Sequence, residues 1–443
     1  MKSIASLPTV LQHLLTTEAN QAAIRSGFVR RRRKLSGATF VQTVVFGWLN
    51  RPAASLDNLT QTAALLKVAI RPQSLDERFT PQSASCLHQV LEAAVQCVIS
   101  ADPVAIPLLR RFSGVYVDDS STVVLPDALA ALWQGNGGNS SLHTQAALKA
   151  VVRYDLARGA FEGPFLQDGR THDRASVLQK HLPPPGSLRL ADTAFVALGV
   201  LRTLDERGAF YLSRLPRTIA LFTPHGERLD LLAHLQAAPD QVDERVLLGV
   251  KQRLPSRLIA VRVPQEVAKE RRERLREAAR VRQEIVSEQA LALCGWTLLI
   301  TNLPPQRLSV VEALVLLRIR WQIERLFCLW KDHGLLDVWR TANPWRILTE
   351  VYAKFLALLI GHWLVLQGCW DLPNRSLVKA AQTVQVFAPL VALALAQRIP
   401  GLDLRIVLDV LAEVLACGCR MNSRRTKPNA YQLLLDPSLL GYP

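Results

Sequence analysis

The stretch GVYVDDSSTVVLP, residues 114–126, decides the fold class of this chain. It is rich in the β-branched and aromatic residues that favour strands, and a proline closes it. A second stretch of this kind, ALKAVVRYDLARGAF, follows at 147–161. Farther on, up to residue 213, short strand-like segments alternate with helical ones. Strands first, then strand and helix in alternation, predict an α/β sheet with helices packed on it.

Two strands of this predicted sheet carry acids at their ends. Asp118 and Asp119 follow GVYV, and Asp192 ends SLRLAD at 187–192. In open α/β sheets, ligands bind at the rim beyond the carboxyl ends of the strands. The three carboxylates are therefore candidates for a functional site. Taken singly, each is more often the cap of a turn or helix.

A third acid lies in LRIRWQIERLFCLWKDHG, residues 317–334, which is predicted to be one largely buried α-helix. Arg320, Glu324 and Lys331 share one stripe of that helix. In one interpretation Arg320 and Glu324 form an intrahelical ion pair, worth only a few tenths of a kcal/mol on a surface. In the other, Glu324 is held toward an active site while the two cations bind phosphate.

The rest of the chain flanks this sheet with helices and short strands. Residues 1–102 and those from 308 onward are helical in pattern, and 214–300 holds short β segments interrupted by one charged helix. The apolar run at 355–369 is shorter than a membrane span of about 20 residues, so we expect a buried core helix and no membrane contact. Seven scattered cysteines predict free thiols in a reducing compartment.

The charge balance points to a polyanionic partner. The 443 residues contain 53 Lys and Arg against 37 Asp and Glu, a net charge of +16. Nucleic acid is the first candidate and an anionic membrane surface the second. The densest basic run is Arg30, Arg31, Arg32, Arg33 and Lys34. It either contacts phosphate or is simply solvated.

Four blocks of the sequence together resemble a known family. They are VYVDDSSTVVLPDALAALWQGNGG, LADTAF with LDERGAFYLSRL, GWTLLITNLP, and RWQIERLFCLWK. In this order they are similar to the DDE transposases of bacterial insertion sequences, most of all the IS-four family that includes the Tn-five transposase. The most specific block is the last, where Arg320, Glu324 and Lys331 match the family motif in order and spacing. The resemblance covers nearly the whole chain.

The resemblance implies an RNase H-like catalytic core with a β-rich insertion. The roughly 130 residues between Asp192 and Glu324 are too many for a simple connection, and the β segments fill that gap. We therefore expect five parts. They are a helical DNA-binding domain at 1–102, the first part of the core at 103–213, the insertion at 214–300, the acidic helix at 301–345, and a helical C-terminal region at 346–443.

The resemblance also implies the catalytic residues. Asp119 rather than Asp118 aligns with the first acid, and Asp192 and Glu324 are the second and third. They are expected to hold two Mg²⁺ or Mn²⁺ ions, since carboxylate oxygens suit hard cations and two ions can serve an in-line displacement at phosphorus. Two positions depart from the family pattern: Leu317 stands where it has Tyr, and Ala194 where it often has Gly.

Further expectations concern DNA and partners. Arg320 and Lys331 are expected to contact phosphate beside the cleaved bond, and the basic run at 30–34 to contact DNA ends. Trp296 either stacks on a flipped base, as a tryptophan does in cut-and-paste relatives, or packs in the core. Double-stranded DNA, a homodimer assembled on it, and a cytoplasmic, nucleoid-associated location are implied. The alternative function is a catalytically impaired or domesticated relative that only binds DNA ends.

Overall fold

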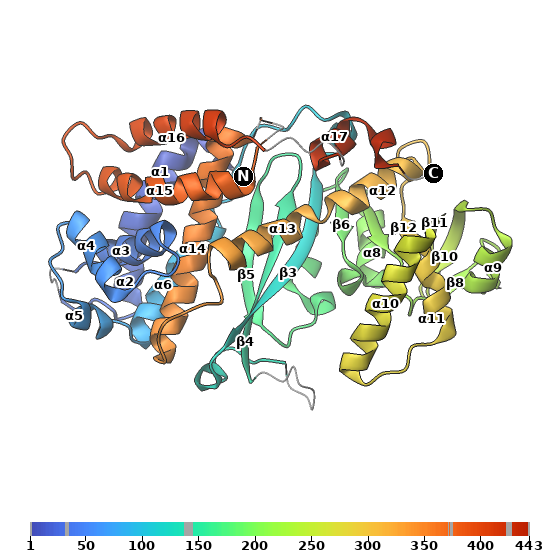
Figure 1. The fold of residues 1–443 in the computed structure, drawn as a ribbon, viewed down its shortest axis with the longest axis horizontal. Coiled ribbons are helices and arrows are strands. Elements are labelled where there is room, and N and C mark those ends of the chain that lie inside the picture. The colour runs from blue at the N-terminus through green and yellow to red at the C-terminus, as the bar shows by residue number, and fades with distance from the viewer. Residues whose placement is uncertain are drawn as a thin grey trace.

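The computed structural model describes residues 2–31, 35–136, 145–370, 372, 375–421 and 428–441. It is an elongated mixed α/β molecule, with helices from both ends of the chain at one end, strands in the middle and a second group of strands at the other end (Figure 1). The prediction of an α/β fold is confirmed. Of the acids predicted to be catalytic, Asp119 lies on β3, Asp192 directly follows β6, and Glu324 lies on α13.

One large mixed sheet runs through most of the molecule. Within the described residues its order is β5-β4-β3-β6-β7-β12-β11-β10-β8-β9. β3 pairs antiparallel with β4 and parallel with β6, which in turn pairs parallel with β7. The bounds of these central strands are β3 Val115–Leu125, β4 Ala146–Asp155, β5 Phe161–Asp168, β6 Leu188–Ala191 and β7 Phe210–Arg214.

The β segments of 214–300 continue this same sheet. β12 pairs antiparallel with β7, placing Leu299 opposite Arg214, and β11 and β10 follow outward. Their strands are β8 Leu221–Phe222, β9 Arg228–Leu229, β10 Gln241–Leu248, β11 Leu254–Arg262 and β12 Trp296–Thr301. Three helices cross or flank them: α9 Leu231–Ala237, the charged α10 Gln265–Arg282, and α11 Glu288–Ala292. Hydrogen bonds of the backbone therefore join the insertion to β7, the strand next to β6.

Helices from the two ends of the chain share one core. α14 packs against α3 and α6 from the N-terminal part and against α15 and α16 from the C-terminal part. The N-terminal helices are α1 Leu7–Gln12, α2 Ala19–Arg25, α3 Gly37–Asn50, α4 Leu56–Leu65, α5 Pro72–Asp76, α6 Pro81–Val95 and α7 Pro107–Arg110. The C-terminal ones are α14 Pro344–Cys369, α15 Leu377–Leu395, α16 Leu404–Gly418 and α17 Ala430–Leu435.

Two of these helices are long and apolar enough to cross a bilayer by length and composition alone. In α14, 83% of the most apolar window is buried inside the protein, and in α15 33% is. α14 contains the apolar run at 355–369, and it forms the centre of the helical bundle (Figure 1). Its apolarity is that of a core helix, as the sequence predicts.

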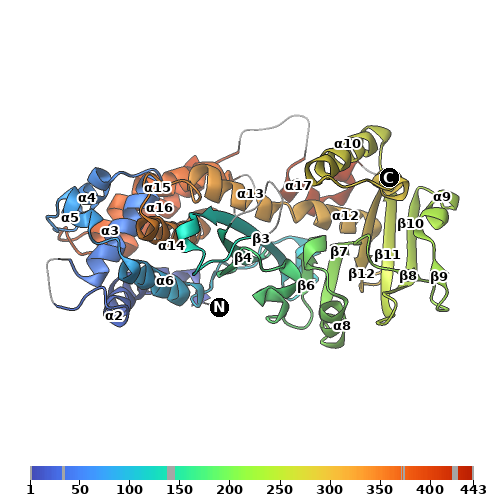
Figure 2. The same ribbon diagram turned by 90° about the horizontal axis from the view of Figure 1, so that it is seen from below.

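The acidic segment is interrupted, where the sequence predicts one continuous helix. α12 spans Val310–Ile319, a turn follows at Arg320 and Trp321, and α13 spans Gln322–Cys328. A π-helical turn, Leu329–His333, continues from α13. Figure 2 shows α12 and α13 on one side of the sheet and α8, Leu198–Glu206, on the other. Both residues of the turn keep right-handed helical backbone angles, and the side chain of Trp321 is 49% exposed rather than buried.

Candidate active site

Asp119 and Asp192 lie at adjacent positions on neighbouring strands. The parallel pairing of β3 with β6 ends with Asp118 opposite Ala191, and each acid is the next residue. One strand spacing, about 4.8 Å, therefore separates the two chains at this point. Contrary to expectation, β3 itself does not end at Asp118 and Asp119, because it continues to Leu125 paired with β4. The parallel pairing of β3 with β6 ends at this point, so Asp119 has no pairing partner on β6.

The third acid approaches from the helix above. Glu324 lies in the first turn of α13, which packs on β3. Arg320 lies between the acids. Its Nη2 is 2.9 Å from Glu324 Oε1 and its Nη1 is 3.8 Å from Asp119 Oδ2. The arginine is only 5% exposed, so its charge interacts with these two carboxylates rather than with solvent.

The charges of the other two acids act on Asp119. Burial raises the pKa of Asp119 to about 6. The negative charges of Glu324 and Asp192 add to that rise, while the Ser120 amide and Arg320 oppose it. Carboxylates crowded in this way repel one another and favour binding of a cation or a proton.

Asp118 occupies a different environment from Asp119. It is fully buried and accepts hydrogen bonds from Arg153 Nε at 2.7 Å, from Arg153 Nη2 at 2.9 Å and from Arg189 Nε at 2.7 Å. Burial alone would raise the pKa of Asp118, but the two arginines hold it below its ordinary value. Its oxygens are therefore occupied, which supports the choice of Asp119 for the site.

The donor set fits a divalent metal ion in its chemistry. Asp119 Oδ1 accepts from the Ser120 amide at 2.8 Å, and Asp192 Oδ1 accepts from the Thr193 amide at 2.7 Å. One oxygen of each carboxylate is thereby oriented, and hard oxygen ligands suit Mg²⁺ or Mn²⁺. Among the described residues, no three His, Cys, Asp or Glu side chains are close enough together to hold an ion as they stand. Arg320 supplies the positive charge instead.

The other predicted residues are spread more widely. Lys331 lies in the π-helical turn and donates to the backbone carbonyl of Thr122 on β3, at 3.0 Å. Arg30 and Arg31 are exposed between α2 and α3. Arg32, Arg33 and Lys34 lie outside the described residues.

Trp296 packs within the β-rich insertion. It begins β12, is 7% exposed, and packs with Leu235, Val242 and Ala260 in a core of the insertion. The guanidinium of Arg262 covers its ring, 4.6 Å from the centroid. This environment is that of the core tryptophan which the sequence left as one of two interpretations.

Sequence reasoning missed two residues beside the acids. Arg214, exposed at the end of β7, has a pKa lowered by partial desolvation and by the nearby charges of Arg271 and Arg320, while Asp192 and Glu324 oppose that shift. It therefore adds a cation to the rim of the site. Trp321 presents a large exposed ring one turn before Glu324. A lone arginine after a strand gives no sequence signal, and Trp321 was assigned to a buried helix face.

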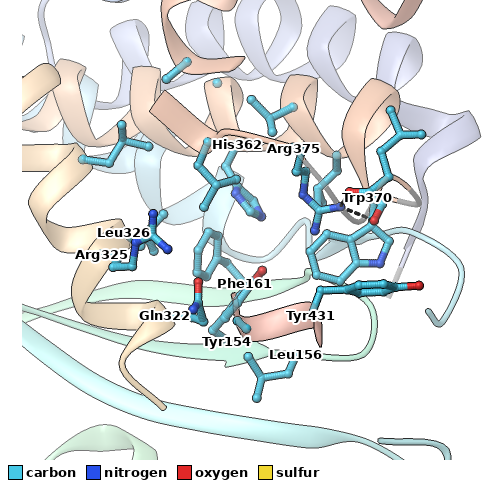
Figure 3. A pocket seen from close by; sticks show the side chains of 18 of the residues that line it. Tyr154, Leu156, Phe161, Gln322, Arg325, Leu326, His362, Trp370, Arg375 and Tyr431 are labelled. Carbon is cyan, nitrogen blue, oxygen red and sulfur yellow. Dashed lines mark hydrogen bonds between the residues drawn. The ribbon is translucent and has the colours of Figure 1, made fainter. Parts of the chain in front are cut away.

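The opposite face of α13 borders a cavity of about 470 Å³. Figure 3 shows Gln322, Arg325 and Leu326 of α13 along one side, with aromatic rings from β4, β5 and the C-terminal helices around it. His362 lines it as well and hydrogen-bonds the carbonyl of Gly159 at 2.7 Å. Burial lowers the pKa of His362 to about 4, so it is neutral at physiological pH. The acids face away from this cavity, which is distinct from their site.

The fold and the site define a class of protein. Convergent carboxylates on two parallel strands and a helix, surrounded by arginines and a lysine, suit metal-assisted displacement at a phosphodiester. A profile of the transposase DDE domain matches residues 110–360, more than half of the chain. The chain therefore belongs to the DDE transposase family, as its resemblance implied. It is an enzyme of DNA transposition, and the family acts with divalent metal ions.

Relatives of known name agree with this assignment. The transposase for insertion sequence element IS231B of Bacillus thuringiensis subsp. berliner is 25% identical over 376 residues, which cover 79% of this chain and 77% of the relative. That for IS1151 of Clostridium perfringens is 23% identical over 373 residues, covering 79% and 78%. That for IS421 of Escherichia coli is 26% identical over 369 residues, covering 81% and 93%.

Proposed function

We propose that this transposase cuts and joins DNA at the ends of an insertion sequence, using two Mg²⁺ or Mn²⁺ ions held by Asp119, Asp192 and Glu324. The observation that carries the proposal is the register of β3 and β6, which sets two acids side by side beneath Glu324. The order β5-β4-β3-β6-β7, with three antiparallel strands followed by parallel ones, supports an RNase H-like core. We retain the five-part division at 1–102, 103–213, 214–300, 301–345 and 346–443 as part of this proposal.

The side chains would divide the work by charge. Bound metal ions would activate the attacking oxygen and stabilise the leaving one. The carboxylates hold that charge at the rim of the sheet. Arg320, Arg214 and Lys331 would bind the phosphates on either side of the reacting one, and the hydrogen bond of Lys331 to Thr122 orients its ammonium group along β3.

The test is cleavage of DNA that carries the ends of the element. Mg²⁺ or Mn²⁺ should support nicking and strand transfer, and Ca²⁺ should support binding with little cleavage because it tolerates loose coordination. Glu324→Gln should keep DNA binding and abolish cleavage, since it removes a metal ligand and no phosphate contact. Lys331→Ala should weaken both. Tight binding by the wild-type protein without any cutting in Mn²⁺ would instead support the DNA-binding-only alternative, and Leu317→Tyr would then be the first rescue to attempt.

The path of DNA is proposed from the distribution of charge. With a net charge of +16, affinity should fall steeply with salt, with a slope of log K against log salt of about −0.9 per neutralised phosphate. The double substitution Arg30→Ala with Arg31→Ala should make that slope less steep by about 1.8, which corresponds to two phosphates, if both side chains contact the DNA backbone. An unchanged slope would remove them from the interface.

We also propose that the protein acts as a homodimer on DNA in the cytoplasm, associated with the nucleoid. α15 and α16 pack together, and both expose apolar side chains, among them Val386 at 73% and Ile406 at 54%. Large exposed apolar areas commonly mark interaction sites. Val386→Glu with Ile406→Glu should reduce the dimeric fraction on DNA in sedimentation experiments without lowering thermal stability.

The free state of all seven cysteines is compatible with a reducing compartment.

A further inference from the structure

Arg320 is the one residue in contact with both Asp119 and Glu324 among the described ion pairs. Its two terminal nitrogens reach different partners, Nη2 to Glu324 Oε1 at 2.9 Å and Nη1 to Asp119 Oδ2 at 3.8 Å. The forked guanidinium is the side chain best suited to bridge two carboxylates. A positive charge thus already lies between two of the proposed metal ligands.

The contacts of the Arg320 guanidinium are incomplete, although its backbone is held. The residue lies in the turn between α12 and α13, where its amide donates to the carbonyl of Leu316 at 3.0 Å. Its Nε is buried without a hydrogen-bond partner in the described part of the chain. A buried donor without a partner is unfavourable, so a change of partners would let the guanidinium satisfy it. The longer contact to Asp119 is loose as well.

We propose that Arg320 is an internal counterion which holds Asp119 and Glu324 in the metal-free protein and gives them up when divalent cations bind. This inference rests on the proposed function, since it takes both acids to be metal ligands. The released guanidinium is then free to bind a DNA phosphate at the same rim. One arginine therefore couples metal loading to DNA binding: the protein without metal keeps its strongest phosphate-binding group turned inward.

The coupling can be measured without DNA and without turnover. Mn²⁺ binding to the full-length protein is followed by the paramagnetic resonance signal of free Mn²⁺, and thermal stability is recorded in EDTA and in Mn²⁺. Arg320→Gln should bind Mn²⁺ more tightly than wild type, by about 5-fold or more, the lower end of typical coupling between two ligands. Its melting temperature should fall in EDTA and rise more than that of wild type on adding Mn²⁺.

Three further variants make the result specific. Arg325→Gln removes the same charge from the adjoining helix α13, at an exposed position on the side of the cavity, and should bind Mn²⁺ as wild type does. Arg320→Lys keeps the charge but not the fork, so it should tighten binding by a smaller factor. It also serves if Arg320→Gln fails to fold. Glu324→Gln should weaken Mn²⁺ binding.

The outcomes separate this inference from the proposed function. Affinity for Mn²⁺ that is unchanged or weaker in both Arg320 variants, or equally tightened in Arg325→Gln, overturns the counterion role. If Glu324→Gln still loses Mn²⁺ in that case, the metal site itself stands. If folded wild-type protein binds no Mn²⁺ at all, the proposed metal site fails together with the counterion.

Discussion

Asp118 and Asp119 are consecutive residues of β3, and they belong to two different regions. Asp118 points into the sheet's buried side, where Arg153 and Arg189 enclose it and hold its pKa below the ordinary value. Asp119 lies at the rim with Asp192 and Glu324, has only a loose contact to Arg320, and its pKa is raised to about 6. Successive side chains along a strand point to opposite faces of the sheet. Asp118 and Asp119 therefore lie in different environments although they are adjacent in sequence.

The difference shows what distinguishes a structural carboxylate from one that we propose to be catalytic. Both acids face arginine, so the presence of a cation does not separate them. Asp118 has three short charged hydrogen bonds and no access to solvent, which leaves no oxygen for a ligand. Asp119 has surplus negative charge around it, and surplus negative charge is what binds a cation.

The largest expected effect is on catalysis at the rim. Asp119→Asn should lower the rate of DNA cleavage by roughly 10⁴-fold, the scale seen when an essential group is removed, while the protein stays folded. Asp118→Asn, as its neighbour, should lose activity only in proportion to lost folded protein. Cleavage assays on samples matched for folded fraction by circular dichroism check this. Equal specific losses in both variants would erase the distinction between the two acids.

The next largest effect is on stability at the buried acid. Asp118→Ala leaves Arg153 and Arg189 buried without their shared partner, and breaking a buried ion pair costs about 3–5 kcal/mol. Urea denaturation should show that loss in the free energy of unfolding. Asp119→Ala should not lower it, because its ion pair with Arg320 is loose and its ionisation on folding is unfavourable.

The pH dependence of stability should differ in sign between the two positions. The pKa of Asp119 is higher in the folded state, so in EDTA its ionisation on folding is unfavourable. The free energy of unfolding should fall as pH rises from about 4 to about 6, by at most about 3 kcal/mol at 1.36 kcal/mol per pKa unit. Asp119→Asn should remove that fall. Asp118 contributes stability above its ordinary pKa, and that contribution is lost only as pH falls further, through its lowered folded value.

The smallest expected effect is on DNA binding by an exposed tryptophan, compared with a buried one. Trp321 is 49% exposed at the rim, and Trp296 is 7% exposed in the insertion core. Trp321→Ala should leave stability nearly unchanged and weaken binding of DNA with an unpaired base at the cut site by about 1–3 kcal/mol. Trp296→Ala should cost about 3–5 kcal/mol of folding stability. Fluorescence anisotropy and thermal melts distinguish the two, and reversed results would restore Trp296 as the stacking residue.

Local patterns were sufficient to predict the strand at 114–126 and the buried helix containing 355–369, and they singled out Asp119, Asp192 and Glu324 as candidates. The preference for Asp119 over Asp118 came from family resemblance, and its physical reason, the enclosure by Arg153 and Arg189, depends on strands far apart in sequence. Long-range pairing also explains the misses. β7 pairs with β12 across about 85 residues, and no local pattern places Arg214 beside Glu324. The interruption between α12 and α13 at Arg320 contains no proline or glycine, so the sequence does not predict it.

The pairing of β7 with β12 has a consequence for how this chain can change over generations. The segment between Arg214 and Leu299 adds its own strands to the sheet and returns on the strand next to β7, with Leu299 opposite Arg214. Its two ends are thus about 4.8 Å apart, the width of one strand. Doubling the length of such a segment adds only about 0.6 kcal/mol of closure entropy. Residues can therefore be inserted, deleted or replaced between β7 and β12 without moving Asp192 or Glu324. This junction is where we expect the protein to acquire new contacts.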